Sequence, residues 1–150
     1  SGTAMTDAEA TSRRRIYIVD DQDFVVAMIT KFLEAGNFDI RSTTDSAVAE
    51  QQIADWKPDA VIVDIMMPGL NGLEMIRRLK SEHGLQDSKF LVVTSKPMQE
   101  FATTAKAAGA AISQLYGAEG VIFPLSRSGT HATLLSPLTS LCASVYGPRS

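Results

Sequence analysis

Cysteine, long apolar runs and an excess of one charge are all scarce in this chain of 150 residues. Its single cysteine, Cys142, excludes an internal disulfide and is consistent with a reducing compartment. No apolar run approaches the roughly 20 residues that span a bilayer, so we expect no contact with a membrane. The 14 basic and 17 acidic residues leave a net charge of −3, which gives no overall bias toward nucleic acid.

The start of the chain carries little information about the fold. Residues 1–4, ahead of Met5, resemble a cloning remnant, and the polar opening does not have the pattern of a signal peptide. The basic run at residues 13–15 is short, and we interpret it as solvated. We expect residues 1–14 to form a disordered lead-in and residues 15–147 to form one domain, because 45% apolar content at this length supports one core rather than two.

Strand-like apolar runs alternate with helical patterns along the rest of the chain. The expected strands are residues 16–20, 38–42, 60–64, 90–93 and 121–123, and the expected helices are residues 24–33, 45–56, 73 to near 84, 98–116 and 130–145. This alternation, with right-handed crossovers, predicts an α/β fold with a doubly wound, five-stranded parallel sheet flanked by helices. The functional site of such a sheet lies at the carboxyl ends of its strands.

Three aspartates stand where two of these strands end. Asp20 and Asp21 close the first strand, and Asp64 closes the third. Three converging carboxylates repel one another unless a hard divalent cation lies among them, so the pattern indicates a Mg²⁺ site with a nucleophilic aspartate. The alternative is that each is an ordinary strand-end or helix-capping aspartate.

The motifs around these residues resemble a known family. They are Val19-Asp20-Asp21, the segment at residues 63–72 (VDIMMPGLNG), and Val92-Val93-Thr94-Ser95. Over nearly the whole chain after Arg15 they resemble the receiver (phosphoacceptor) domain of bacterial two-component response regulators. The resemblance implies a flavodoxin-like fold, a bacterial cytoplasmic location, and a histidine kinase or histidine phosphotransfer protein as the source of phosphate.

The resemblance also assigns a role to individual residues. Asp64 matches the phosphorylated aspartate, Asp21 a direct Mg²⁺ ligand, and Asp20 the acid that holds the ion through water. Met66 would offer its backbone carbonyl to the metal, and Thr94 matches the hydroxyl that switches inward toward the phosphoryl group. The chemistry of phosphoryl transfer supports these roles, because a carboxylate is a weak nucleophile that needs positioning and a cation beside the phosphoryl oxygens.

One family residue is missing. The family has a lysine before a proline at the end of the fifth strand, where this chain has Phe123-Pro124, and no lysine follows Lys106. The segment between Gly109 and Pro124 is also longer than usual. Lys96 is a candidate substitute cation, and the alternative is an exposed loop lysine.

Three functions compete on this evidence. The first is a stand-alone phosphoacceptor module, not an enzyme in the usual sense, whose output is a contact with another protein. The second is a pseudo-receiver that binds partners without phosphotransfer, which the missing lysine favours. A phosphohydrolase with an aspartate nucleophile is disfavoured, because Met66 stands where such enzymes have a second acid. We expect Ile112, Leu115 and Tyr116 to contribute to the partner surface, and the alternative is that these three side chains pack under the loop.

Overall fold

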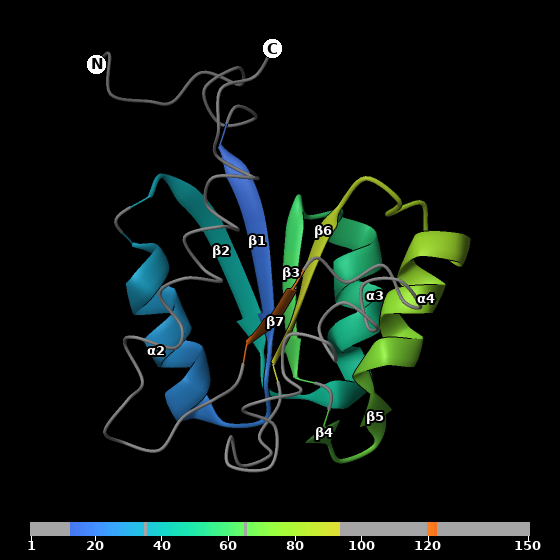
Figure 1. Ribbon diagram of the computed structural model, residues 1–150, viewed down its shortest axis with the longest axis horizontal. Helices are drawn as coiled ribbons and strands as arrows, with labels where there is room; N and C mark the ends of the chain where they lie inside the picture. The colour runs from blue at the N-terminus through green and yellow to red at the C-terminus, as the bar shows by residue number, and fades with distance from the viewer. Residues whose placement is uncertain (1–12, 35, 65, 94–119, 123–150) are drawn as a thin grey trace.

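A parallel sheet forms the centre of the molecule. The computed structural model describes residues 13–34, 36–64, 66–93 and 120–122. The strands are β1 (Arg14–Val19), β2 (Phe38–Thr43), β3 (Ala60–Asp64), β6 (Lys89–Val93) and β7 (Gly120–Ile122), paired in parallel in the order β2-β1-β3-β6-β7 (Figure 1). The predicted doubly wound, five-stranded sheet is confirmed.

Helices cover both faces of this sheet within the described residues. Helix α2 (Asp23–Leu33) lies on one face, and α3 (Ser46–Trp56) and α4 (Gly72–Glu82) lie on the other (Figure 1). The predicted cap of α3 is confirmed, because the Asp45 carboxylate accepts a hydrogen bond from the Ala47 amide at 2.9 Å. None of the helices described has the length and apolar character that crossing a bilayer requires.

The core consists of two apolar layers, one on each face of the sheet. The layer beneath α3 and α4 contains Tyr17, Val19, Ile53, Trp56, Val61, Val63, Met75, Ile76, Leu79, Phe90 and Val92. The layer beneath α2 contains Ile16, Ile18, Val25, Ile29, Leu33, Ile62, Leu91 and Val93. Successive residues of β1 and β3 alternate between the layers, as the twofold period of a strand requires. All five residues of β3 are buried, since this central strand is covered on both faces.

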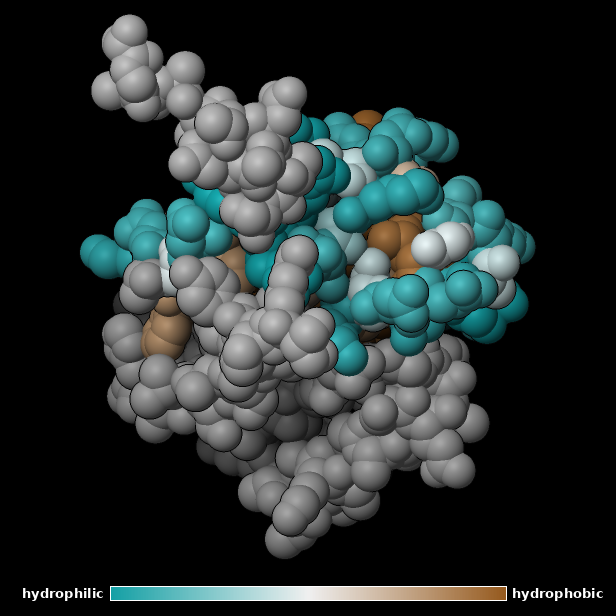
Figure 2. Space-filling view, turned by 90° about the horizontal axis from the view of Figure 1, so that it is seen from above, coloured by the Kyte–Doolittle hydropathy of each residue, from teal (hydrophilic) through white to brown (hydrophobic). Residues whose placement is uncertain are grey.

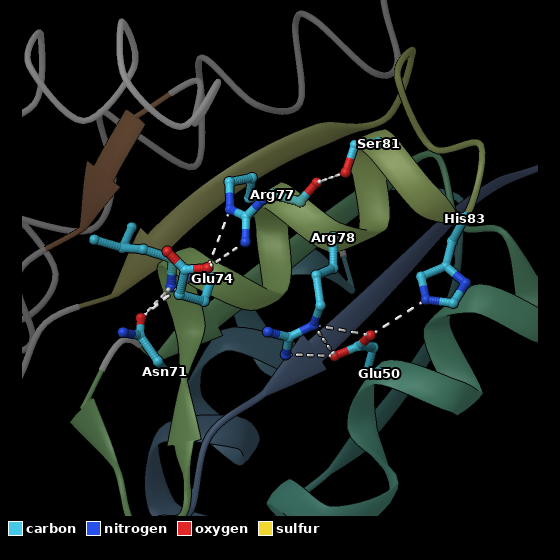
Figure 3. Close-up of polar contacts among 8 residues, drawn as sticks. Glu50, Asn71, Glu74, Arg77, Arg78, Ser81 and His83 are labelled. Carbon is cyan, nitrogen blue, oxygen red and sulfur yellow. Dashed lines mark hydrogen bonds and ion pairs between the residues drawn. The ribbon is translucent and has the colours of Figure 1, made fainter.

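Charged side chains join the two helices on the shared face. The Arg78 guanidinium on α4 donates from two nitrogens to the Glu50 carboxylate on α3, at 2.7 and 3.0 Å (Figure 3). The His83 ring lies 3.2 Å from the same carboxylate. At the amino-terminal edge of the sheet the described surface is mostly hydrophilic, with small apolar areas among polar side chains (Figure 2). The polar contacts of Glu50 with Arg78 and His83 hold α4 against α3 without contributing to the apolar core.

The connection after β3 is more regular than a plain loop. The sequence predicts a turn-rich segment there, and the structure folds it into the antiparallel pair β4 (Met66–Met67) and β5 (Leu70–Asn71). Gly69 has a φ of 75°, which allows the tight turn between the two strands. The helices predicted at residues 98–116 and 130–145 lie outside the described residues.

Candidate functional site

The acidic residues meet at the carboxyl edge of the sheet. Strands β1 and β3 are parallel neighbours with Val19 opposite Val63, so the residues that follow these two positions come out side by side. Those residues are Asp20 and Asp64. One carboxylate oxygen from each of them and one from Asp21 all lie within 4.8 Å of one another. The sequence pattern thus leads to one three-carboxylate cluster, which we call the acidic pocket.

The three carboxylates differ in their exposure to solvent. Asp20 and Asp64 are each only 2% exposed, whereas Asp21 is exposed. Asp20 and Asp64 are therefore the buried members of the acidic pocket, and Asp21 is the member that meets solvent.

Burial changes the acidity of Asp20. Loss of solvation raises its pKa from 3.8 to about 7, although the Gln22 amide donates to this carboxylate at 2.9 Å and opposes the rise. The negative charges of Asp64 and Asp21 raise the pKa further. A buried carboxylate beside two others favours a bound cation, since a cation offsets both the desolvation and the repulsion.

The donor set fits a hard divalent cation. All three side chains offer oxygen, which Mg²⁺ prefers, and their mutual distances allow one ion to contact more than one of them. Within the described residues this is the group of His, Cys, Asp and Glu side chains close enough to hold a metal. Met66, two residues after Asp64, begins the β4–β5 hairpin.

Hydrogen bonds join the segments that carry these residues. The Asp20 amide donates to the Thr43 carbonyl at 3.3 Å, and the Thr43 hydroxyl accepts from the Asp45 amide at 3.0 Å. The Ser46 hydroxyl donates to the Pro68 carbonyl at the tip of the hairpin, at 3.0 Å. Asn71 accepts from two amides of the first turn of α4, at 3.1 and 3.2 Å (Figure 3).

The structure covers part of the predicted site. It brings Asp20, Asp21 and Asp64 together, and it places Met66 at the start of β4, two residues after Asp64. Thr94 and Lys96 lie outside the described residues. So do Phe123-Pro124, where the usual lysine is missing, and the proposed partner surface at Ile112, Leu115 and Tyr116. Their predicted roles stay predictions.

Sequence reasoning missed the contribution of Ser46. The sequence pattern assigns a role only to the neighbouring Asp45, as the cap of α3, and it gives no sign that the Ser46 hydroxyl binds the hairpin. The Pro68 carbonyl that accepts from Ser46 is 22 residues away in the sequence. A contact at that separation leaves no periodic signal, so only the fold reveals it.

Comparison with known proteins identifies the family. Residues 16–112 match the model of the response regulator receiver domain, and the chain belongs to that family. Its members are signalling domains of two-component systems that receive a phosphoryl group from histidine kinases.

Individual relatives agree with this assignment. The DNA-binding response regulator MtrA of Mycolicibacterium smegmatis is 35% identical over 75 residues, which cover 50% of this chain and 33% of that protein. The match thus spans about a third of the relative, and what the rest of that relative does is not transferred to this chain.

Solved structures show the same fold. The BeF3-activated N-terminal receiver domain of RstA from Klebsiella pneumoniae superposes with a TM-score of 0.62 and 26% identity, covering 85% of this chain and 97% of that one. The chemotaxis response regulator CheY4 of Vibrio cholerae has a TM-score of 0.64 and 20% identity, covering 86% and 98%. This second likeness concerns the fold alone.

Proposed function

We propose that this chain is a phosphoacceptor that is phosphorylated on Asp64 with Mg²⁺ bound in the acidic pocket. The observation that carries the proposal is the convergence of Asp20, Asp21 and Asp64 within 4.8 Å at the carboxyl edge of the sheet. The match of this chain to the receiver family supports it. The source of phosphate is a histidine kinase or a histidine phosphotransfer protein, and the output is a contact with another protein.

The reaction is a transfer of one phosphoryl group. A carboxylate oxygen of Asp64 forms a bond to phosphorus while the bond from phosphorus to the donor's leaving atom breaks, and the leaving group takes the electron pair. Burial of Asp64 excludes water that would compete for the phosphoryl group. Bound Mg²⁺ would neutralise charge on the phosphoryl oxygens. Asp20, Asp21 and Asp64 would hold the ion together with the Met66 carbonyl, since all four groups offer the oxygen ligands that Mg²⁺ prefers.

Two further residues complete the proposed site. The Thr94 hydroxyl, directly after β6, donates to the phosphoryl group once it is attached and so reports its presence. The Lys96 ammonium takes the place of the lysine that is absent before Pro124. Without a fixed cation the phosphorylated state forms slowly and switches weakly, because positive charge stabilises the transferring group.

The competing function is a pseudo-receiver that binds partners without phosphotransfer, and Phe123-Pro124 is the sequence feature that favours it. Incubation with Mg²⁺ and acetyl phosphate, followed by intact mass measurement, separates the two. The phosphoacceptor gains the mass of one phosphoryl group, and Asp64→Asn does not. An unmodified parent protein, or equal modification of Asp64→Asn, would reject the proposal.

A further inference from the structure

A short turn connects the two segments that build the acidic pocket. The turn comprises residues 43–46, between the end of β2 and the start of α3, and we call it the 43–46 turn. In Figure 1 the connection from β2 to α3 crosses the carboxyl edge of the sheet toward the β4–β5 hairpin. It thus passes the edge where the aspartates gather.

One end of the turn contacts the first acidic segment. The Thr43 carbonyl accepts a hydrogen bond from the Asp20 amide at 3.3 Å. The Thr43 hydroxyl accepts from the Asp45 amide at 3.0 Å, which fixes the backbone leading into α3. The position of Asp20 is therefore linked to the start of α3 through the carbonyl and the side-chain hydroxyl of Thr43.

The other end of the turn contacts the hairpin that follows Asp64. The Ser46 hydroxyl donates to the Pro68 carbonyl at 3.0 Å. A serine at the start of a helix usually caps it, but here the Asp45 carboxylate accepts from the Ala47 amide. The Ser46 hydroxyl is therefore not needed for capping, and its contact with Pro68 is its one hydrogen bond recorded in the described part of the chain.

Within the described residues, Met67 and Leu70 pack against the apolar core on either side of the hairpin tip, and the Ser46 hydroxyl adds a hydrogen bond to the tip itself. Each strand of the hairpin has two residues, and at its base the hairpin is joined to β3 and to the capped first turn of α4. Gly69 at the tip has a φ of 75°, and its Cβ position would lie 3.5 Å from the Ser46 hydroxyl oxygen. Ser46 thus lies directly against the hairpin turn at Pro68 and Gly69. Met66 comes two residues before Pro68, whose carbonyl accepts the hydrogen bond from Ser46.

We propose that Ser46 is a positioning residue that holds the β4–β5 hairpin, and with it the Met66 carbonyl, in place for Mg²⁺. This inference rests on the proposed function. Ser46 does not touch the ion. It acts by restricting the hairpin, so that less ordering is needed when the cation binds.

The test is Ser46→Ala in the full chain, with Mg²⁺ affinity measured by isothermal titration calorimetry. We expect affinity to fall about threefold to tenfold, the range for one hydrogen bond at a partly exposed position. The Mg²⁺ concentration for half-maximal phosphorylation by acetyl phosphate rises by the same factor, while the rate at saturating Mg²⁺ stays within about twofold. In the metal-free protein, hydrogen exchange in the hairpin accelerates, and Ser46→Thr, which keeps the hydroxyl, restores parental values.

Ser81→Ala is the matched control. The Ser81 hydroxyl on α4 also donates to a backbone carbonyl, that of Arg77, at 2.8 Å (Figure 3). Removing it deletes the same kind of bond away from the acidic pocket, so Mg²⁺ affinity should stay at the parental value. An equal loss of affinity in both variants would mean a general effect on helices and would overturn the inference.

The remaining outcomes separate the two proposals. If the parent binds Mg²⁺ and is phosphorylated but Ser46→Ala matches it in affinity and hairpin exchange, the role of Ser46 is refuted and the proposed function stands. If the parent neither binds Mg²⁺ nor accepts phosphate, both are rejected. If only the rate at saturating Mg²⁺ falls, Ser46 affects the reaction and not the metal, which also contradicts the inference.

Discussion

Mg²⁺ binding to this domain should depend on pH near neutrality, because Asp20 has to lose a proton first. Its pKa is raised to about 7, chiefly by burial. The apparent affinity is scaled by the ionised fraction of this carboxyl, which is roughly ten elevenths at pH 8, one half at pH 7 and one eleventh at pH 6. We therefore expect affinity to fall about tenfold from pH 8 to pH 6, whereas a carboxyl with an ordinary pKa would give almost no change.

The raised pKa of Asp20 makes the stability of the metal-free protein fall as the pH rises, whereas Mg²⁺ affinity increases. Because the folded-state pKa of Asp20 is raised, the metal-free protein is stabilised while this carboxyl is protonated. That stabilisation is complete below the ordinary pKa of 3.8 and is lost as the pH rises through about 7. Saturating Mg²⁺ should remove the loss at high pH, since the cation takes the place of the proton.

Calorimetric titration with Mg²⁺ at pH values of about 6, 7 and 8 measures the affinity change. The titration is repeated in buffers of different ionisation enthalpy. Because the buffer takes up the protons that Mg²⁺ binding releases, the dependence of the measured heat on the buffer gives their number. Asp20→Asn, which mimics the protonated side chain, should bind Mg²⁺ weakly at every pH and flatten the stability profile of the metal-free protein. Asp87→Asn, an exposed aspartate before β6, is the control. A parental affinity that changes less than about twofold over this range would refute the argument.

Four further outcomes are expected. Asp21→Ala should abolish Mg²⁺ binding and phosphorylation, yet leave the metal-free fold intact or slightly more stable because repulsion is relieved; undiminished phosphorylation would contradict its role. Ile53→Ala, at a fully buried position, should lower the free energy of unfolding in urea by about 2–5 kcal/mol, and a loss under 1 kcal/mol would mean the core repacks. Asp45→Ala should cost about 1 kcal/mol in the same assay through loss of the α3 cap, and an unchanged midpoint would show that the cap is dispensable. Arg78→Met should cost about 0.5–1 kcal/mol by breaking the pair with Glu50, and a cost that does not shrink at high salt would argue against an ionic origin.

Local sequence was sufficient to locate the main elements. Strand β3 coincides with the predicted run because it consists of apolar residues that need burial on both faces. The start of α3 was predicted because an aspartate cap is a local signal, read from one residue and its neighbours. The convergence of Asp20 and Asp64 could also be anticipated, since parallel strands bring their carboxyl ends to one edge.

Other features depend on residues that meet only after folding. The raised pKa of Asp20 results from the desolvation that the packed structure imposes, so no spacing rule could give it. The pairing of Glu50 with Arg78 and His83 joins two helices, and a helical pattern shows which face a residue occupies but not which partner lies opposite.

The sequence by itself determined the α/β alternation, the family motifs and the identity of the acidic residues, because these are encoded in short-range patterns of apolar, turn and carboxylate residues. Only the tertiary structure decided that residues 43–46 lie between Asp20 and the hairpin after Asp64. That arrangement arises from the strand order, which places the end of β2 beside β1 and sends the chain across the carboxyl edge into α3. Contacts of this kind are fixed by how the elements pack, and nothing in the residues around Ser46 specifies a carbonyl 22 positions away.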